Sequence, residues 1–185
     1  MFQKKDFFTI PNLMSCFRIL LIPVFVYAYL NAHSVNGTYK ALAVLILSGV
    51  TDFFDGIAAR KLHQVTELGK ALDPIADKLT LGAVIFCLIR RIDGFQYLFL
   101  IFIIKELYML LGNLAAMKLR GKKLDGAAFI GKAATMITYW CMGFFLLFPE
   151  MPGNIQILLI IVCGGMMTVS GLYYLPVFYR LIRKI

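Results

Sequence analysis

Long apolar stretches separated by short polar connections run through the whole chain. Six of these stretches are about 20 residues long, which is enough for a helix to cross a bilayer. They span residues 13–30, 39–62, 67–89, 95–117, 127–148 and 155–179. Polar, glycine or proline residues fill the connections between them, as in NAHSVNGT at 31–38. The pattern predicts an all-α integral membrane protein with six transmembrane helices, forming one domain over residues 1–185.

The first nine residues differ from this pattern. Residues 1–9 set Lys4, Lys5 and Asp6 between aromatic side chains, which is typical of a short segment lying in the membrane interface. A frayed terminus is the alternative. No small-residue cleavage site follows the first apolar stretch, so we expect that stretch to be a helix and not a signal peptide.

Composition supports a membrane protein. Hydrophobic residues make up 61% of the chain and charged residues 16%, which excludes an ordinary soluble domain. The net charge of +9 could suggest nucleic acid, but the basic residues stand at the ends of the apolar stretches. Anionic lipid headgroups are the better partner, and we expect no nucleic acid. The cysteines have no metal-ligand spacing and are expected to be buried reduced thiols: Cys16, Cys87, Cys141 and Cys163.

The basic residues also predict an orientation. One side of the membrane receives Lys4, Lys5, Arg60, Lys61, Lys118, Arg120, Lys122, Lys123, Arg180, Arg183 and Lys184, and the other only Lys40, Arg90 and Arg91. The richer side should be cytoplasmic. We therefore expect both termini and the acidic residues to face the cytoplasm. The membrane itself is expected to be a bacterial cytoplasmic membrane.

Four aspartates lie inside the second and third stretches. Asp52 and Asp55 share one helix face, and Asp73 and Asp77 share another, because residues three or four apart lie on the same side of a helix. Ionisable groups at membrane depth are costly and mark a functional site. The short connection between the two stretches predicts antiparallel packing that brings the four carboxylates into one pocket.

Such a pocket needs cations, because four ionised carboxylates repel one another strongly in a low dielectric. Oxygen ligands favour Mg²⁺ or Mn²⁺, and the absence of His and Cys from the pattern argues against zinc. Two such cations can clamp a phosphoryl group during its displacement. Arg18, inside the first stretch, either has an anionic partner or extends to the membrane interface.

Small and basic residues accompany the aspartates. Arg60 stands one turn after Gly56 and could hold a phosphate in a bidentate grip. The small residues Gly56, Ala59 and Gly69 permit close helix packing or the close approach of a flat ligand such as a nucleobase.

These residues form a known signature. The pattern Asp52-x2-Asp55-Gly56-x2-Ala59-Arg60-x8-Gly69-x3-Asp73-x3-Asp77 resembles that of the CDP-alcohol phosphotransferases at every position, and the start TIPNLMSCFRILLIPVF is similar more loosely. The resemblance implies transfer of a phosphatidyl group from CDP-diacylglycerol to a polar alcohol acceptor, with release of CMP. It also implies a homodimer, for which small residues such as Gly164 and Gly171 could line a helix interface.

The resemblance assigns roles by position. It makes Asp52, Asp55, Asp73 and Asp77 the ligands of two divalent cations, Mg or Mn, and Asp77 also the catalytic general base. It makes Gly56, Ala59 and Gly69 cytidine-binding residues and Arg60 a diphosphate contact.

The acceptor is less constrained. The segment Asp73–Lys78, DPIADK, is most similar to the branch that makes phosphatidylglycerol phosphate from glycerol 3-phosphate, or cardiolipin from phosphatidylglycerol. Users of glycerol 3-phosphate in this branch carry an Arg-Glu pair and a later arginine on the fourth span, where this chain has Lys105-Glu106 and no arginine before Arg120. The acceptor candidates are Lys78, Lys105, Lys132 and Arg120.

Other functions remain open from the sequence. Another acceptor, such as inositol phosphate or serine, would suit the same signature. From a different class, an ion-coupled transporter also places carboxylates within the membrane, but it would spread them along a route across the bilayer.

Overall fold

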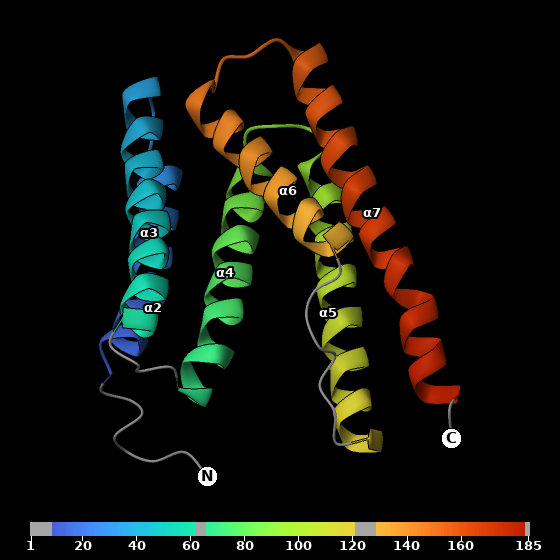
Figure 1. Cartoon of the computed structure of the whole chain (residues 1–185). Helices are drawn as coiled ribbons and strands as arrows, with labels where there is room; N and C mark the ends of the chain where they lie inside the picture. The colour runs from blue at the N-terminus through green and yellow to red at the C-terminus, as the bar shows by residue number, and fades with distance from the viewer. Residues whose placement is uncertain (1–8, 62–65, 121–128, 184–185) are drawn as a thin grey trace. The chain divides into compact units, whose positions relative to one another are not determined.

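Helices account for nearly all of the structure. The computed structural model describes residues 9–61, 66–120 and 129–183 (Figure 1). In these ranges it has the helices α2 (Ile10–Leu30), α3 (Val35–Lys61), α4 (Glu67–Leu88), α5 (Phe95–Arg120), α6 (Phe129–Leu147) and α7 (Gly153–Arg183). Their bounds follow the six predicted stretches closely. Residues 1–8, which hold most of the predicted interfacial segment, lie outside the described residues.

Five of these helices are long and apolar enough to cross a membrane, which supports the prediction of an integral membrane protein. The exception is α4, so a sixth span is not confirmed. Its first twelve residues include five charged ones, which lower its hydropathy: Glu67, Lys70, Asp73, Asp77 and Lys78.

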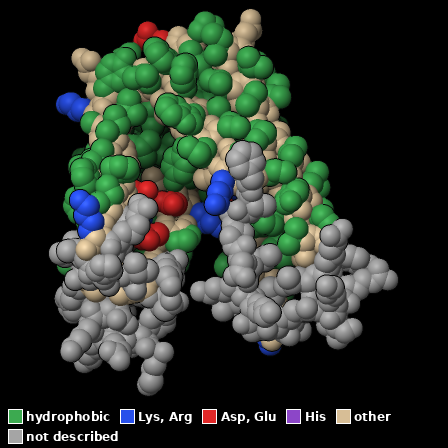
Figure 2. Space-filling model, in the orientation of Figure 1, with side chains coloured by type: hydrophobic (Ala, Val, Ile, Leu, Met, Phe, Trp, Pro, Cys, Tyr) green, Lys and Arg blue, Asp and Glu red, His purple; other side chains and the backbone are tan. Residues whose placement is uncertain are grey.

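The outer faces of the helices are apolar. Hydrophobic side chains cover most of the described part of the face shown in Figure 2. Trp140 and Tyr27 are 74% and 72% exposed, which would be unfavourable in water and suits contact with lipid. The four cysteines are free. Cys87, Cys141 and Cys163 are buried as expected, whereas Cys16 is exposed because it lies on the same apolar outer face of α2 as Leu20.

The chain divides into two compact units, the first ending at Cys87 and the second beginning at Leu88. In the first unit, α2 and α3 form an antiparallel pair (Figure 1). The turn between them is tight, since a Cβ atom on Gly37 would lie 2.8 Å from the Cα of Ala32. Phe25, Tyr29 and Ala41 are buried.

In the second unit, α7 packs against both α5 and α6. Phe95 and Phe145 make an edge-to-face contact with ring centroids 4.9 Å apart. Gly112 of α5 lies directly under the ring of Phe178, which is itself held edge-on by Tyr108 at 5.3 Å. Because glycine has no side chain, residue 112 allows α5 and α7 to approach each other closely.

Replacing this glycine tests the packing. We expect Gly112→Ala to lower Tm, because the new methyl group would collide with the ring of Phe178, which is buried and held in place by Tyr108. Gly165→Ala on α7 is the matched control, since its Cβ would have no neighbour within 4 Å. That control should be neutral, or stabilising by up to about 1 kcal/mol through helix propensity. Thermal unfolding of the purified protein in detergent measures both, and equal Tm values for the two variants would contradict the packing argument.

Candidate active site

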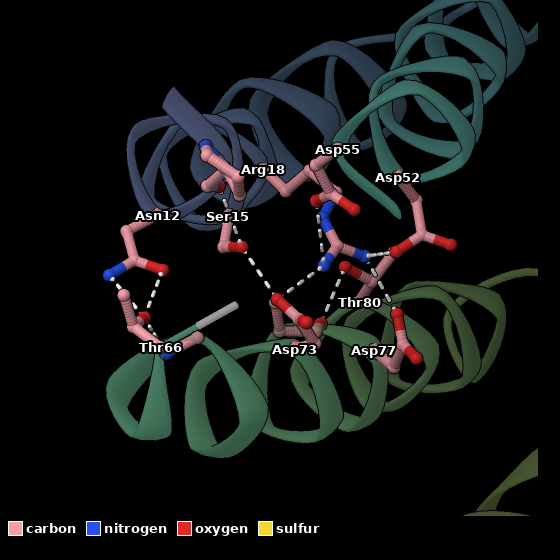
Figure 3. A network of polar contacts seen from close by, with 12 residues as sticks. Asn12, Ser15, Arg18, Asp52, Asp55, Thr66, Asp73, Asp77 and Thr80 are labelled. Carbon is pink, nitrogen blue, oxygen red and sulfur yellow. Dashed lines mark hydrogen bonds and ion pairs between the residues drawn. The ribbon is translucent and has the colours of Figure 1, made fainter. Parts of the chain in front are cut away.

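Arg18 of α2 lies at the centre of the polar residues of the first unit. Its guanidinium faces the side chains of Asp52, Asp55, Asp73 and Asp77, called the aspartate cluster below (Figure 3). α3 carries the first two of these residues and α4 the other two.

The two terminal nitrogens of Arg18 share the four carboxylates. Nη1 donates a hydrogen bond to Oδ1 of Asp77 at 2.8 Å and forms an ion pair with Oδ1 of Asp52. Nη2 lies 3.5 Å from Oδ2 of Asp55 and 3.6 Å from Oδ1 of Asp73. Arg18 thus has the anionic partners that its position inside an apolar helix requires.

The site is closed on one side and open on the other. The side chains of Arg18 and Asp55 are only 3% and 6% exposed. Asp52, Asp73 and Asp77 are 47%, 46% and 45% exposed. A ligand can therefore reach three of the four carboxylates, while Arg18 supplies a single positive charge from the buried side.

Two further residues of α2 join Arg18 in contacting α4. Ser15 donates a hydrogen bond to Oδ1 of Asp73 at 2.6 Å. Asn12, which is buried, donates to Oγ1 of Thr66 at 3.0 Å, and the same hydroxyl accepts the backbone N–H of Gly69 at 3.0 Å. Thr66 therefore caps the first turn of α4 and also ties it to α2.

This arrangement changes one expectation from the sequence. Close helix packing among the described residues of the first unit is between α2 and α3, whereas α4 is joined to α2 through polar side chains. Arg18 gathers the four carboxylates, and the part of the chain that the structure describes does not show the predicted direct packing of α3 on α4.

Sequence reasoning missed Asn12 and Ser15. The signal was present, because Asn12, Ser15 and Arg18 recur every three residues and so lie along one side of an otherwise apolar helix. Only their contacts with α4 show that this row belongs to the site.

The remaining signature residues lie on the same helices. Gly56, Ala59 and Arg60 are in α3, with side-chain environments outside the described part of the chain. Gly69 is buried, and a Cβ atom there would lie 2.6 Å from Oδ1 of Asn12. A larger residue at position 69 would therefore displace the side chain of Asn12, so packing against α2 also favours a glycine there.

The acceptor candidates are distributed over both units. Lys78 is exposed on α4, next to Asp77, and Lys132 is exposed on α6. Lys105 is 13% exposed, pairs with Glu106 at 2.9 Å and lines a cavity of about 300 Å³ together with Tyr108 and Thr168. The side chain of Arg120 is outside the described residues. A joint role in binding the acceptor stays a prediction.

The aspartate cluster fits divalent cations by its chemistry. Its donors are all carboxylate oxygens, the ligands that Mg²⁺ and Mn²⁺ prefer. Oδ2 of Asp55 is buried without a hydrogen-bond partner, so it has a free lone pair for a cation. While these side chains surround Arg18, the described ranges contain no group of three Asp, Glu, His or Cys residues close enough together to hold a metal ion.

Carboxylates gathered at one open polar site of a helical membrane protein suit an enzyme that handles charged substrates. The comparison with known proteins names the family. Residues 8–177 match CDP-alcohol phosphatidyltransferase, and the chain belongs to this family. Its members transfer a phosphate-containing group to an alcohol, which sets aside the transporter alternative.

Individual relatives agree with the family. A Mycobacterium tuberculosis protein named "Putative cardiolipin synthase" is 35% identical over 170 residues, which cover 89% of this chain and 76% of the relative. "Cardiolipin synthase (CMP-forming)" of Streptomyces coelicolor is 35% identical over 135 residues, or 72% of this chain and 62% of the relative. "CDP-diacylglycerol–glycerol-3-phosphate 3-phosphatidyltransferase" of Rickettsia felis is 44% identical over 82 residues, which cover 44% of this chain and 45% of the relative.

The link between α2 and α4 can be tested by a double-mutant cycle. Asn12→Ala and Thr66→Val should each lower stability, and the double variant should lose about 1 kcal/mol less than their sum, because each single change leaves a polar partner unsatisfied. Thermal unfolding in detergent gives the values. Thr168→Val, which removes only a hydroxyl bonded within its own helix, is the control and should be additive with Asn12→Ala. Additivity between Asn12 and Thr66 would disprove the link.

Proposed function

We propose that this protein transfers the phosphatidyl group of CDP-diacylglycerol to phosphatidylglycerol, forming cardiolipin and releasing CMP. The main support is that the four carboxylates of the aspartate cluster converge on Arg18 at an open site. The chain also belongs to a family that uses CDP-activated substrates. A donor with two acyl chains also explains why this site belongs to a membrane protein.

The aspartate cluster would hold two divalent cations, Mg²⁺ or Mn²⁺. When bound, such cations neutralise the diphosphate and stabilise the charge that develops on the attacking and leaving oxygens. The buried Asp55 would anchor the cations from below, and the three half-exposed carboxylates would face the substrate.

Asp77 is proposed as the general base. Its carboxylate is 45% exposed, so an acceptor hydroxyl can approach it. As the acceptor oxygen attacks the phosphorus that carries the diacylglycerol, Asp77 takes the hydroxyl proton. A new P–O bond forms, the bond between the two phosphate groups breaks, and CMP leaves with the bridging oxygen.

The donor's nucleotide would lie along α3 and the start of α4. In this proposal, Gly56, Ala59 and Gly69 border the cytidine and Arg60 contacts the diphosphate. The site would open to the cytoplasmic side of a bacterial membrane, and the chain would act as a homodimer.

Two observations favour phosphatidylglycerol as the acceptor. Two relatives whose matches cover 89% and 72% of this chain are named as cardiolipin synthases. The Lys105-Glu106 pair also departs from the Arg-Glu pair associated with glycerol 3-phosphate. Glycerol 3-phosphate is the second candidate, because a relative named for that acceptor is 44% identical over 82 residues. Lys78, Lys105, Lys132 and Arg120 would supply the positive charge that either anionic acceptor needs.

Replacing the base tests the mechanism. Asp77→Asn should lower the rate of CMP release by about 10²–10⁴-fold, because the amide cannot accept the acceptor's proton. Asp93→Asn, an exposed acid in the turn after α4, is the matched control and should keep normal activity. The purified protein is assayed with CDP-diacylglycerol and acceptor, and its elution in size-exclusion chromatography reports folding. A folded Asp77→Asn variant with normal activity would exclude this role.

Assays with single acceptors test the substrate. CMP release from CDP-diacylglycerol should require phosphatidylglycerol, and the lipid product should be cardiolipin. Release with glycerol 3-phosphate alone would support the second candidate. Release with neither would exclude both acceptors.

A further inference from the structure

Arg18 contacts the same four carboxylates that are proposed to hold the metal. Arg18 engages Oδ1 of Asp52, Asp73 and Asp77 and Oδ2 of Asp55. Each cluster member thus points one oxygen at the guanidinium. A divalent cation on the same carboxylates would lie close to the guanidinium, and the repulsion between the two positive groups favours displacement of Arg18.

Arg18 satisfies the cluster incompletely. It brings one positive charge to four carboxylates. Nη2 is 3.5 and 3.6 Å from the carboxylates of Asp55 and Asp73, longer than the 2.7–2.9 Å or so of a strong charged hydrogen bond. Nε and Nη2 of Arg18 and Oδ2 of Asp55 are buried without hydrogen-bond partners. Cations of higher charge can bind these oxygens better than a guanidinium does.

We propose that Arg18 and divalent cations occupy the aspartate cluster alternately. This inference rests on the proposed metal site. In the metal-free protein Arg18 is the resident cation that holds α3 and α4 in register, and it leaves the cluster when divalent cations bind. Arg18 is a positioning residue in this scheme: it keeps the carboxylates gathered and lowers the apparent metal affinity by the fraction of time that it occupies them.

The test uses the full chain in detergent, stripped of metal with EDTA. Mn²⁺ binding is followed by electron paramagnetic resonance of the free ion, and Tm is measured in EDTA and in saturating Mg²⁺. Arg18→Gln removes the resident cation. Arg18→Lys keeps the charge but cannot bridge four carboxylates with a single ammonium group. Lys40→Gln removes one exposed positive charge from the other end of α3 and is the control.

We expect Arg18→Gln to bind Mn²⁺ at least about tenfold more tightly than the unmodified protein. Its Tm should fall in EDTA, where the carboxylates lose their cation, and match the unmodified protein in saturating Mg²⁺, where Arg18 has already left the cluster. Arg18→Lys should also bind Mn²⁺ more tightly. Lys40→Gln should change neither the affinity nor the difference between the two Tm values.

Three results would overturn the proposal. The first is an unchanged or weaker Mn²⁺ affinity in Arg18→Gln. The second is a loss of Tm in Mg²⁺ as large as in EDTA, because Arg18 would then stay with the carboxylates beside the metal. The third is an Arg18→Lys affinity equal to that of the unmodified protein, which would assign the effect to net charge. If Arg18→Gln does not fold, Arg18→Lys decides between these outcomes.

The same data separate this inference from the proposed function. If the unmodified protein shows no saturable Mn²⁺ binding, the metal site of the proposed function fails, and the inference fails with it. If it binds Mn²⁺ and releases CMP, but Arg18→Gln leaves the affinity unchanged, only the alternation is excluded.

Discussion

The ion pairs between Arg18 and the aspartate cluster are the interaction on which the first unit depends. A buried arginine in an apolar helix is unfavourable without anionic partners, and four carboxylates held close together are unfavourable without a cation. The arginine and the carboxylates therefore each offset the unfavourable charge of the other. Because the arginine lies on α2 and the acids lie on α3 and α4, this one cluster of charges holds three helices together.

Polar contacts have this importance because the hydrophobic effect is weak between helices in lipid. Apolar side chains there gain little by leaving the hydrocarbon, so association depends on close packing and on hydrogen bonds between helices. The first unit uses hydrogen bonds, with Asn12 and Ser15 contacting α4. The second unit uses packing, with Gly112 of α5 under the Phe178 ring.

The same cluster gives the site its chemical character. Three carboxylates are nearly half exposed, whereas Asp55 and Arg18 are buried beneath them. A substrate can thus reach the three exposed carboxylates, whereas the charges of Asp55 and Arg18 lie inside the protein. This suits a family whose substrates carry their reactive diphosphate at the polar end of a lipid, next to acyl chains that stay in the bilayer.

The sequence by itself determined the helices, the membrane class and the position of the acids, because hydropathy and helical spacing are local properties. It predicted the bounds of α2 to α7 within a few residues and placed the aspartates of each helix on one face. Tertiary structure decided how those faces meet. Asn12, Ser15 and Arg18 contact residues 54, 58 and 59 positions further along the chain, and no local pattern specifies such pairs. For that reason the sequence did not predict Asn12 and Ser15 as residues of the site. Only the folded chain shows that α2 gathers the carboxylates of α3 and α4.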